Sequence, residues 1–384
     1  MLLNQNKIYI FDGAAGTTLS GFLKNAMPPE YLNVENPSAV IKMHEQYIEC
    51  GADIVKTNSF GGNAYKLKKY GLENKLRELN AKAVENAVKA KANSKILIAG
   101  STGPTGELPQ PMGAGDFEFY RNSYYSQIKT LIESGADIIL LETFSSLFEL
   151  KAAFLTVKEI NKNTPVFISV TYTNGKTIFG TKPEIFARAF DYLGAEAIGS
   201  NCIAGAKEIE NVCNEYYRNT NKNIFIMPNA GIPYFENGKA VYPENEETFA
   251  YNTVCASHAR ANILGGCCGA EYGHIKKLKA AAADLKPLPK CAKTLEFACS
   301  DRYIEYHDGS RNYFETETDA EKAVDYGLEN TGECIIVNCK KDNNIAEFIK
   351  DFQTYCQNPL IFRNAGAEQK DLILKNYNGI AKHI

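Results

Sequence analysis

Eight apolar, β-branched runs recur along the first three quarters of the chain. Each run is almost continuously hydrophobic, which is typical of parallel strands covered by helices. The stretches between them, such as NPSAVIKMHEQYIECG, carry apolar residues three or four positions apart, which indicates amphipathic helices. The runs occupy residues 7–13, 52–60, 95–104, 136–144, 165–173, 195–202, 223–231 and 261–269.

This alternation predicts an α/β fold of the (β/α)8 (TIM) barrel type. Eight strand–helix units within about 280 residues are what such a barrel requires. A faint internal repeat supports the assignment, since YIECGADIVKTNSF resembles LIESGADIILLETF. An open doubly wound sheet is the alternative, and the even spacing of the eight runs favours closure into a barrel.

The character of the sequence changes after residue 285. The segment LKPLPKCAK holds two prolines and reads as a linker, which we place at residues 286–294. We therefore expect a barrel over residues 1–285 and a small α/β domain over residues 295–384. In this last part DAEKAVDYGLE, NIAEFIKDFQTYC and EQKDLILKNY predict helices, while ECIIVNC and PLIFRN predict strands. No motif in it can be assigned to a chemistry.

Composition excludes several classes of partner. The net charge of −3 gives no electrostatic reason to expect nucleic acid or an anionic membrane. No apolar run approaches the length that spans a bilayer, and the N-terminal residues lack the features of a signal peptide. The 11 cysteines are an odd number scattered irregularly, which fits a reducing compartment. We expect a cytoplasmic protein.

Polar residues gather at the C-terminal end of the predicted strands. In a barrel these ends converge on one mouth, where active sites are built. Asp12, Glu142 and Asn229 each stand at such an end. Each could serve a structural role at its strand, and jointly they could surround an ammonium group. The glycines of FDGAAGTTL expose backbone N–H groups that could bind a carboxylate.

Three cysteines share the predicted mouth. Cys202 closes the sixth strand, and Cys267 and Cys268 follow the eighth. Three thiolates would hold zinc and leave one position open, as in catalytic zinc sites. A substrate thiol entering that position would lose its proton, which predicts activation of a thiol for alkyl transfer. A redox-active vicinal disulfide and simple packing of buried cysteines are the alternatives.

Seven segments together resemble the homocysteine S-methyltransferase family, most closely the homocysteine-binding module of cobalamin-dependent methionine synthase. They are FDGAAGTTL, HEQYIECGADIVKTNSFGGN, GSTGPTGELPQPMG, ESGADIILLETF, GSNC, MPNAGIP and GGCCG. The resemblance implies a zinc-dependent barrel that methylates homocysteine to methionine, with zinc on Cys202, Cys267 and Cys268. It further implies that the substrate ammonium contacts Asp12, Glu142 and Asn229, and that the substrate carboxylate binds the turn at Ala15 and Gly16. No catalytic residue is expected beyond the zinc-activated substrate thiol.

The methyl donor is less defined by the sequence. The D-x-H-x-x-G signature of the cobalamin module does not occur in these 384 residues. The segment GPTGELPQPMG favours a methylcorrinoid (methylcobalamin) carried by a separate protein as donor. A sulfonium donor such as S-methylmethionine is the alternative. A non-catalytic homocysteine-binding subunit of a methyltransferase complex and a thiol redox barrel are further hypotheses.

Overall fold

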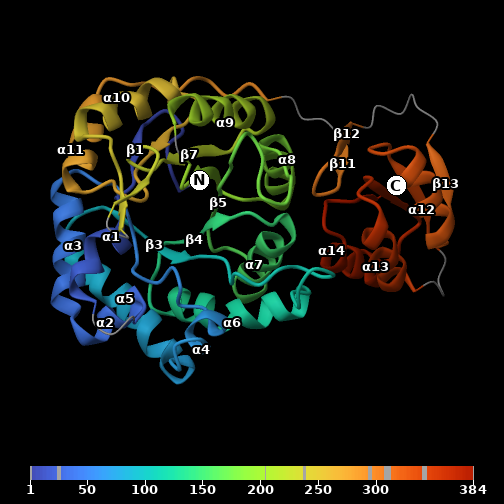
Figure 1. The fold of residues 1–384 in the computed structure, drawn as a ribbon, viewed down its shortest axis with the longest axis horizontal. Coiled ribbons are helices and arrows are strands. Elements are labelled where there is room, and N and C mark those ends of the chain that lie inside the picture. The colour runs from blue at the N-terminus through green and yellow to red at the C-terminus, as the bar shows by residue number, and fades with distance from the viewer. Residues whose placement is uncertain are drawn as a thin grey trace.

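The structure is a computed structural model that describes residues 2–23, 27–203, 205–236, 239–292, 296–306, 313–339 and 344–383. Figure 1 shows a large barrel that holds the first three quarters of the chain and a smaller unit beside it that holds the C-terminal part. Among the described residues, no helix is both long enough and apolar enough to cross a membrane.

Eight parallel strands form one sheet in the large unit, in the order β1-β10-β7-β6-β5-β4-β3-β2. A parallel bridge between Phe11 and Ile54 joins the two outermost strands, and the Asp53 N–H donates to the carbonyl of Ile10 at 2.7 Å. The predicted (β/α)8 barrel is therefore confirmed. The strands are β1 Tyr9–Ile10, β2 Ile54–Lys56, β3 Leu97–Thr102, β4 Ile138–Phe144, β5 Val166–Val170, β6 Ala197–Asn201, β7 Asn223–Met227 and β10 Ile263–Leu264.

Helices surround this sheet. They are α1 Ala15–Leu19, α2 Leu32–Glu35, α3 Pro37–Glu49, α4 Ala64–Lys68, α5 Leu76–Lys91, α6 Phe117–Glu133, α7 Leu147–Ile160, α8 Pro183–Leu193, α9 Ala206–Asn219, α10 Glu246–Ser257 and α11 Tyr272–Ala281. A hairpin of β8 Tyr234–Glu236 and β9 Lys239–Val241 follows β7. Several helices begin at a residue whose side chain accepts a backbone N–H three positions on, which is the usual N-cap arrangement. These caps are Asn36, Asn63, Asp116, Ser146 and Asn245.

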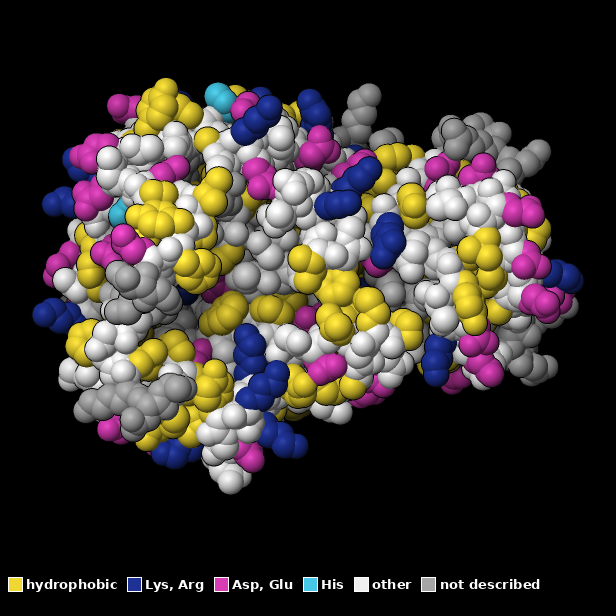
Figure 2. All heavy atoms as spheres, in the orientation of Figure 1, with side chains coloured by type: hydrophobic (Ala, Val, Ile, Leu, Met, Phe, Trp, Pro, Cys, Tyr) yellow, Lys and Arg dark blue, Asp and Glu magenta, His cyan; other side chains and the backbone are white. Residues whose placement is uncertain are grey.

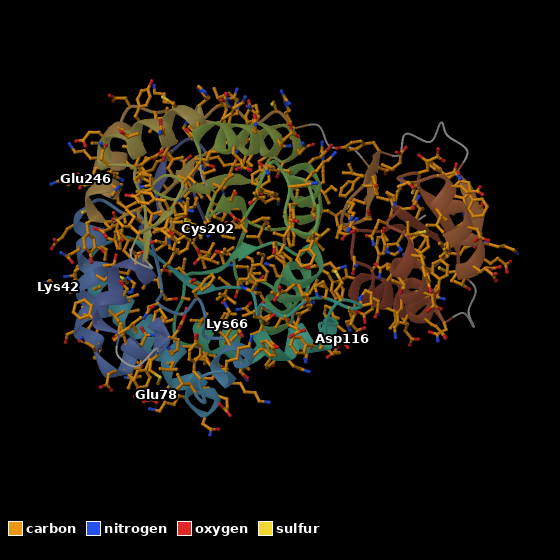
Figure 3. The ribbon with its side chains drawn as sticks, viewed as in Figure 1. Lys42, Lys66, Glu78, Asp116, Cys202 and Glu246 are labelled. Atoms are coloured by element: carbon orange, nitrogen blue, oxygen red, sulfur yellow. The ribbon has the colours of Figure 1, made fainter. Side chains whose placement is uncertain are left out.

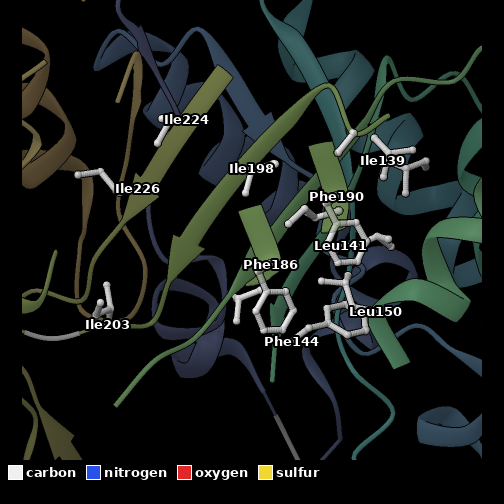
Figure 4. Packing of buried hydrophobic residues seen from close by; sticks show 14 of the residues in the cluster. Ile139, Leu141, Phe144, Leu150, Phe186, Phe190, Ile198, Ile203, Ile224 and Ile226 are labelled. Atoms are coloured by element: carbon white, nitrogen blue, oxygen red, sulfur yellow. The ribbon is translucent and has the colours of Figure 1, made fainter. Parts of the chain in front are cut away.

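The core has two parts, as expected for a barrel. Side chains on the outer face of the sheet pack against the helices, and Figure 4 shows Ile139 and Leu141 of β4 near Phe186 and Phe190 of α8. The barrel interior holds a second cluster that includes three phenylalanines, with Phe11 and Phe225 rings 5.8 Å apart. The alternation of inward and outward side chains follows from the two-residue repeat of a strand.

The C-terminal unit has its own hydrophobic core around a four-stranded parallel sheet. The five elements predicted from its sequence are present, and four short strands add to them. The unit contains β11 Phe297–Cys299, β12 Ile304–Tyr306, β13 Phe314–Thr316, α12 Ala320–Glu329, β14 Ile335–Asn338, α13 Ile345–Tyr355, β15 Leu360–Arg363, α14 Ala367–Asn376 and β16 Lys382–His383. The strand order β13-β14-β15-β16 follows the sequence.

Lys151 of α7 joins the two units. Its side chain is fully buried, and its ammonium donates to the backbone carbonyls of Tyr377 and Gly379, the latter at 3.1 Å. Burial lowers the pKa of Lys151 to about 7. A buried lysine of the barrel thus satisfies carbonyls just beyond α14 of the C-terminal unit.

Candidate metal centre

The three cysteines predicted to share a site lie together. The sulfur atoms of Cys202, Cys267 and Cys268 all lie within 4.8 Å of one another. The Cys202 sulfur is 2.9 Å from that of Cys267 and 3.8 Å from that of Cys268. Cys202 follows β6 and the other two follow β10, with β7 between these strands in the sheet. Figure 3 shows Cys202 near the middle of the barrel.

The adjacent cysteines can share a site because neither belongs to a strand. β10 ends at Leu264, and the chain then turns through Gly269, whose φ of 77° favours glycine. The Cys267 N–H donates to the carbonyl of Pro228 at 2.7 Å, and the Cys268 carbonyl accepts the N–H of Ala230 at 3.0 Å. The alternation of side chains in a strand therefore does not separate the two thiols.

Asn201 ties the thiols to the neighbouring strand ends. Its side-chain nitrogen donates to Thr143 Oγ1 at 2.7 Å and lies 3.6 Å from the Cys267 sulfur. Its oxygen accepts the Thr143 N–H at 2.9 Å and the Ser169 hydroxyl at 2.7 Å. Both Thr143 and Cys202 have positive φ, 66° and 52°, a strained conformation for non-glycine residues that is concentrated at functional sites. The sequence places Asn201 at a strand end but assigns it no role.

Asp12 is paired with a lysine that sequence reasoning missed. Lys56 Nζ lies 3.1 Å from Asp12 Oδ1 without hydrogen-bond geometry, while the Lys56 N–H donates to Oδ2 at 2.9 Å. Burial raises the pKa of Asp12, although Lys56 acts in the opposite direction. Burial acts to lower the pKa of Lys56, but the nearby carboxylates of Asp12 and Glu142 outweigh it, so the pKa of Lys56 is raised. We take the pair as ionised, because the short contact and the backbone N–H both stabilise the carboxylate.

Lys56 could have been recognised from its place in the sequence. It is a charged residue within the run ADIVKTNSF, which otherwise reads as a strand buried on both faces. A buried charge needs a partner of opposite charge, so a strand-end aspartate was the candidate. In the structure Lys56 also donates to the carbonyl of Gly266 at 3.3 Å, next to the two adjacent cysteines.

Glu142 lies beside the cluster at the end of β4 and is only 5% exposed. The Ser101 hydroxyl donates to one of its oxygens, and the Asn201 side-chain nitrogen lies 3.5 Å from the other. Burial raises the pKa of Glu142 to about 7, although Lys56 acts in the opposite direction. This carboxyl therefore changes charge near neutral pH.

Not all of the other residues predicted to bind the substrate line the cavity in front of the cysteines. Ala15 and Gly16 open α1 and line the cavity in front of the cysteines. A Cβ added at Gly16 would meet nothing within 4 Å, so the backbone there borders open space. Asp12 and Asn229 are not among the residues that line this cavity. Asn229 Oδ1 is buried and has no hydrogen-bond partner in the part of the chain that the structure describes, and the Asn229 backbone N–H donates to the carbonyl of Ile203 at 3.0 Å.

The cavity itself has a volume of about 490 Å³ and opens at the mouth of the barrel. Its inner wall combines the three cysteines with Glu142, Lys56 and the turn at Gly13–Gly16. Its outer wall comes from the residues between β2 and α5 and from a short segment before α2. The outer wall consists of Pro28, Pro29, Glu30, Phe60, Gly61, Lys66, Lys69 and Tyr70.

The three thiols suit a zinc ion. Two thiolates of a tetrahedral zinc site with Zn–S bonds of ~2.3 Å lie about 3.8 Å apart, as those of Cys202 and Cys268 do, while the Cys267 sulfur, 2.9 Å from that of Cys202, would move outward by about 0.9 Å. All three cysteines are free, so no vicinal disulfide joins Cys267 and Cys268. Hydrogen bonds among the three thiols raise the pKa of Cys202 and lower the pKa of Cys268, which favours a thiolate within the cluster.

Comparisons with known proteins identify the family of this chain. The sequence profile of the family described as homocysteine S-methyltransferase matches residues 9–282. The chain belongs to this family. The methionine synthase of Mycobacterium tuberculosis is 32% identical over 298 residues, which are 73% of this chain and 25% of that protein. That of Mycobacterium leprae is 30% identical over 295 residues, which are 72% of this chain and 24% of that protein.

The chain thus spans about a quarter of the length of these curated relatives. Among solved structures, the metallated form of the homocysteine methyltransferase MmuM from Escherichia coli superposes with a TM-score of 0.60 at 22% identity. The match covers 71% of this chain and 96% of that one, and it supports the barrel fold. The resemblance seen in the sequence is therefore confirmed, and the chain is a member of a family of methyltransferases.

Proposed function

We propose that this protein transfers a methyl group to the thiol of homocysteine and releases methionine, with zinc as its cofactor. Membership of the homocysteine S-methyltransferase family supports the acceptor and the reaction. The observation that carries the proposal is the cluster of three free thiols at the base of a cavity that can hold an amino acid. A protein that only bound homocysteine would have no need for three converging thiols.

Cys202, Cys267 and Cys268 are the residues that would hold zinc. When bound, zinc would supply positive charge that keeps a substrate thiol deprotonated at neutral pH, where a free thiol with a pKa of about 8.5 is mostly protonated. Asn201 would fix the Cys267 side chain, since its amide lies against that sulfur and is held by Thr143. Among the described residues that line the cavity, no histidine is placed to act as a general base, and an already ionised thiolate needs none.

The amino-acid part of homocysteine would be held by the groups on the inner wall. Glu142 would pair with the ammonium, and the backbone at Ala15 and Gly16 would receive the carboxylate, as the family resemblance implies. Asp12 would act from behind this wall through its ion pair with Lys56. Asn229 would act from beside Cys268, where its oxygen has no partner among the described residues. Holding the thiolate in line with the methyl group lowers the entropic barrier to transfer.

We propose a methylcorrinoid on a separate protein as the donor. The relatives of this chain are methionine synthases about three times its length, of which the match covers about a quarter, and the segment GPTGELPQPMG favours a corrinoid donor. A small sulfonium donor such as S-methylmethionine, and a non-catalytic homocysteine-binding subunit, are the alternatives. The 11 cysteines, all free where described, support a cytoplasmic location.

The first test measures metal and turnover together. The protein is loaded with zinc and mixed with homocysteine and either methylcobalamin or S-methylmethionine, and methionine is quantified by mass spectrometry. We expect Cys202→Ser to lose most of its bound zinc and its turnover, because a serine hydroxyl is a poor zinc ligand. Cys50→Ser, which changes a partly buried cysteine outside the cluster, should keep both. Full zinc content and turnover in Cys202→Ser would contradict the proposal.

A further inference from the structure

The cavity is larger than homocysteine requires. Cavities of ~300–1,000 Å³ usually enclose drug-sized ligands, and homocysteine is a small amino acid. If its sulfur lies at the cysteines, it fills the inner part of the roughly 490 Å³ available. The outer part, bounded by Pro28–Glu30, Phe60–Gly61 and the α4 region, is then left for another molecule.

Two lysines border this outer part from the last turn of α4 and just beyond it. Lys66 is partly buried, with its ammonium 4.7 Å from the centre of the Phe60 ring, and Lys69 is exposed, with its ammonium 4.5 Å from the centre of the Tyr65 ring. Among the described residues, no carboxylate oxygen lies within 4.0 Å of either ammonium. Lys56 deeper in the cavity is already neutralised by Asp12. Glu30 and Glu149 act on Lys66, and Glu107 on Lys69, only from beyond that distance, so these two lysines are the cavity-lining cations able to pair with an anion.

Glu30 on the same wall offsets part of the charge of Lys66, although its oxygens lie beyond ion-pair distance. Its side chain is 3% exposed and one of its oxygens accepts the Gly61 N–H, while its other oxygen is buried without a hydrogen-bond partner. Burial raises the pKa of Glu30, while Lys66 and the Gly61 N–H act in the opposite direction.

Figure 2 shows basic side chains gathered over the α4 region next to hydrophobic ones. Figure 3 shows Lys66 on the α4 side of the barrel and Cys202 nearer its middle, so the two mark the outer and inner ends of the cavity. Phe60 and Tyr70 add aromatic surface, 36% and 48% exposed, to the outer wall. A ligand here would meet positive charge and aromatic faces together.

We infer that the outer part of the cavity is the donor subsite and that Lys66 and Lys69 bind an anionic group of the methyl donor, a carboxylate or a phosphate. This inference rests on the proposed function, which places homocysteine at the inner wall. A purely structural role is the competing explanation, because Lys66 and Lys68 also stabilise the C-terminal end of α4 electrostatically. That role predicts changes in stability and leaves donor affinity unaltered.

Steady-state kinetics at saturating homocysteine distinguish the two explanations. We expect Lys66→Gln and Lys69→Gln each to raise the KM for the donor about tenfold at low salt, since each removes a charge-assisted contact. The KM for homocysteine, measured at saturating donor, should stay unchanged in both variants. The control is Lys68→Gln, which changes an exposed residue of the same helix that does not line the cavity and should behave as wild type. Glu30→Gln should lower the donor KM, the opposite sign. The two donors separate the sources of the anion, because S-methylmethionine offers a carboxylate and methylcobalamin a phosphate.

A direct binding measurement separates failure of the subsite from failure of the proposed function. Inorganic phosphate is titrated calorimetrically into the zinc-loaded protein, and we expect binding that Lys66→Gln weakens about tenfold and that high salt suppresses. Phosphate binding without turnover of any donor would overturn the proposed function and keep the anion subsite. Normal turnover with donor KM and phosphate binding unaltered in both lysine variants would overturn the subsite and keep the function.

Discussion

The Asp12–Lys56 pair gives a sharp test, since its two side chains are 1% and 7% exposed. At 3.1 Å and an effective dielectric constant of about 20, two unit charges attract by ~5 kcal/mol. Removing one partner of a buried pair usually costs ~3–5 kcal/mol. We expect Asp12→Asn to lower the free energy of unfolding by about 3 kcal/mol, because the Gly266 carbonyl and nearby Glu142 still offset part of the Lys56 charge.

The double variant Asp12→Asn/Lys56→Met should recover most of this loss, because no unpaired charge then remains in the barrel. Urea unfolding followed by far-UV circular dichroism, at one fixed zinc concentration, measures all three proteins. Glu247→Gln is the matched control: it breaks an exposed pair with Lys277 and should cost less than about 1 kcal/mol. A loss below about 1 kcal/mol in Asp12→Asn, joined to a large rise in homocysteine KM, would refute the pairing and assign Asp12 directly to the substrate.

Two buried titrating groups give pH-dependent outcomes, both measured by unfolding with metal chelated. Because the folded pKa of Glu142 is raised to about 7, the folded state binds the extra proton, so stability should fall by up to about 3 kcal/mol as pH rises from 5 to 8. Glu142→Gln should remove that fall; an unchanged profile would place the carboxyl in a more polar setting. The folded pKa of Lys151 is lowered to about 7, so stability should rise by up to about 4 kcal/mol between pH 7 and 10. Lys151→Met should lose that rise and release the C-terminal unit to limited proteolysis; equal protease resistance would argue against its joining role.

The barrel could be predicted because its signals are local and repeated. Each of the eight predicted runs contains one strand of the sheet, from Tyr9–Ile10 to Ile263–Leu264. The strands are shorter than the runs, since polar residues at the run ends leave the sheet to form the mouth. The convergence of Cys202 with Cys267 and Cys268 followed from the same topology, because parallel strands all end at one face.

Contacts between polar side chains on different strands of the barrel could not be predicted from the sequence in this way. Lys56 lies 44 residues from Asp12, and its inward direction depends on the register of β2 against β1. Asn201 contacts Thr143, Ser169 and Cys267, which belong to three different segments. Hydrophobic periodicity predicts which helices and strands form. It does not predict which polar side chains contact one another.

In the C-terminal unit, the shortest strands could not be predicted from the hydrophobic pattern of the sequence. Its helices α12–α14 and strands β14 and β15 carry clear apolar patterns and were predicted. β11, β12, β13 and β16 have two or three residues each, too few for a period to be recognised. They form through hydrogen bonds with neighbours such as Ile380, whose carbonyl accepts the Cys299 N–H at 2.9 Å.

The hydrogen bonds that Lys151 donates to the C-terminal unit both end on main-chain carbonyls. Its ammonium recognises carbonyls of Tyr377 and Gly379, groups that every amino acid possesses. The junction therefore depends on the course of the main chain, and at Gly379 it also excludes larger residues, because a Cβ there would lie 1.8 Å from the carbonyl oxygen of Cys299. A substitution in this segment would thus weaken the junction by displacing the backbone, whether or not the new side chain is polar.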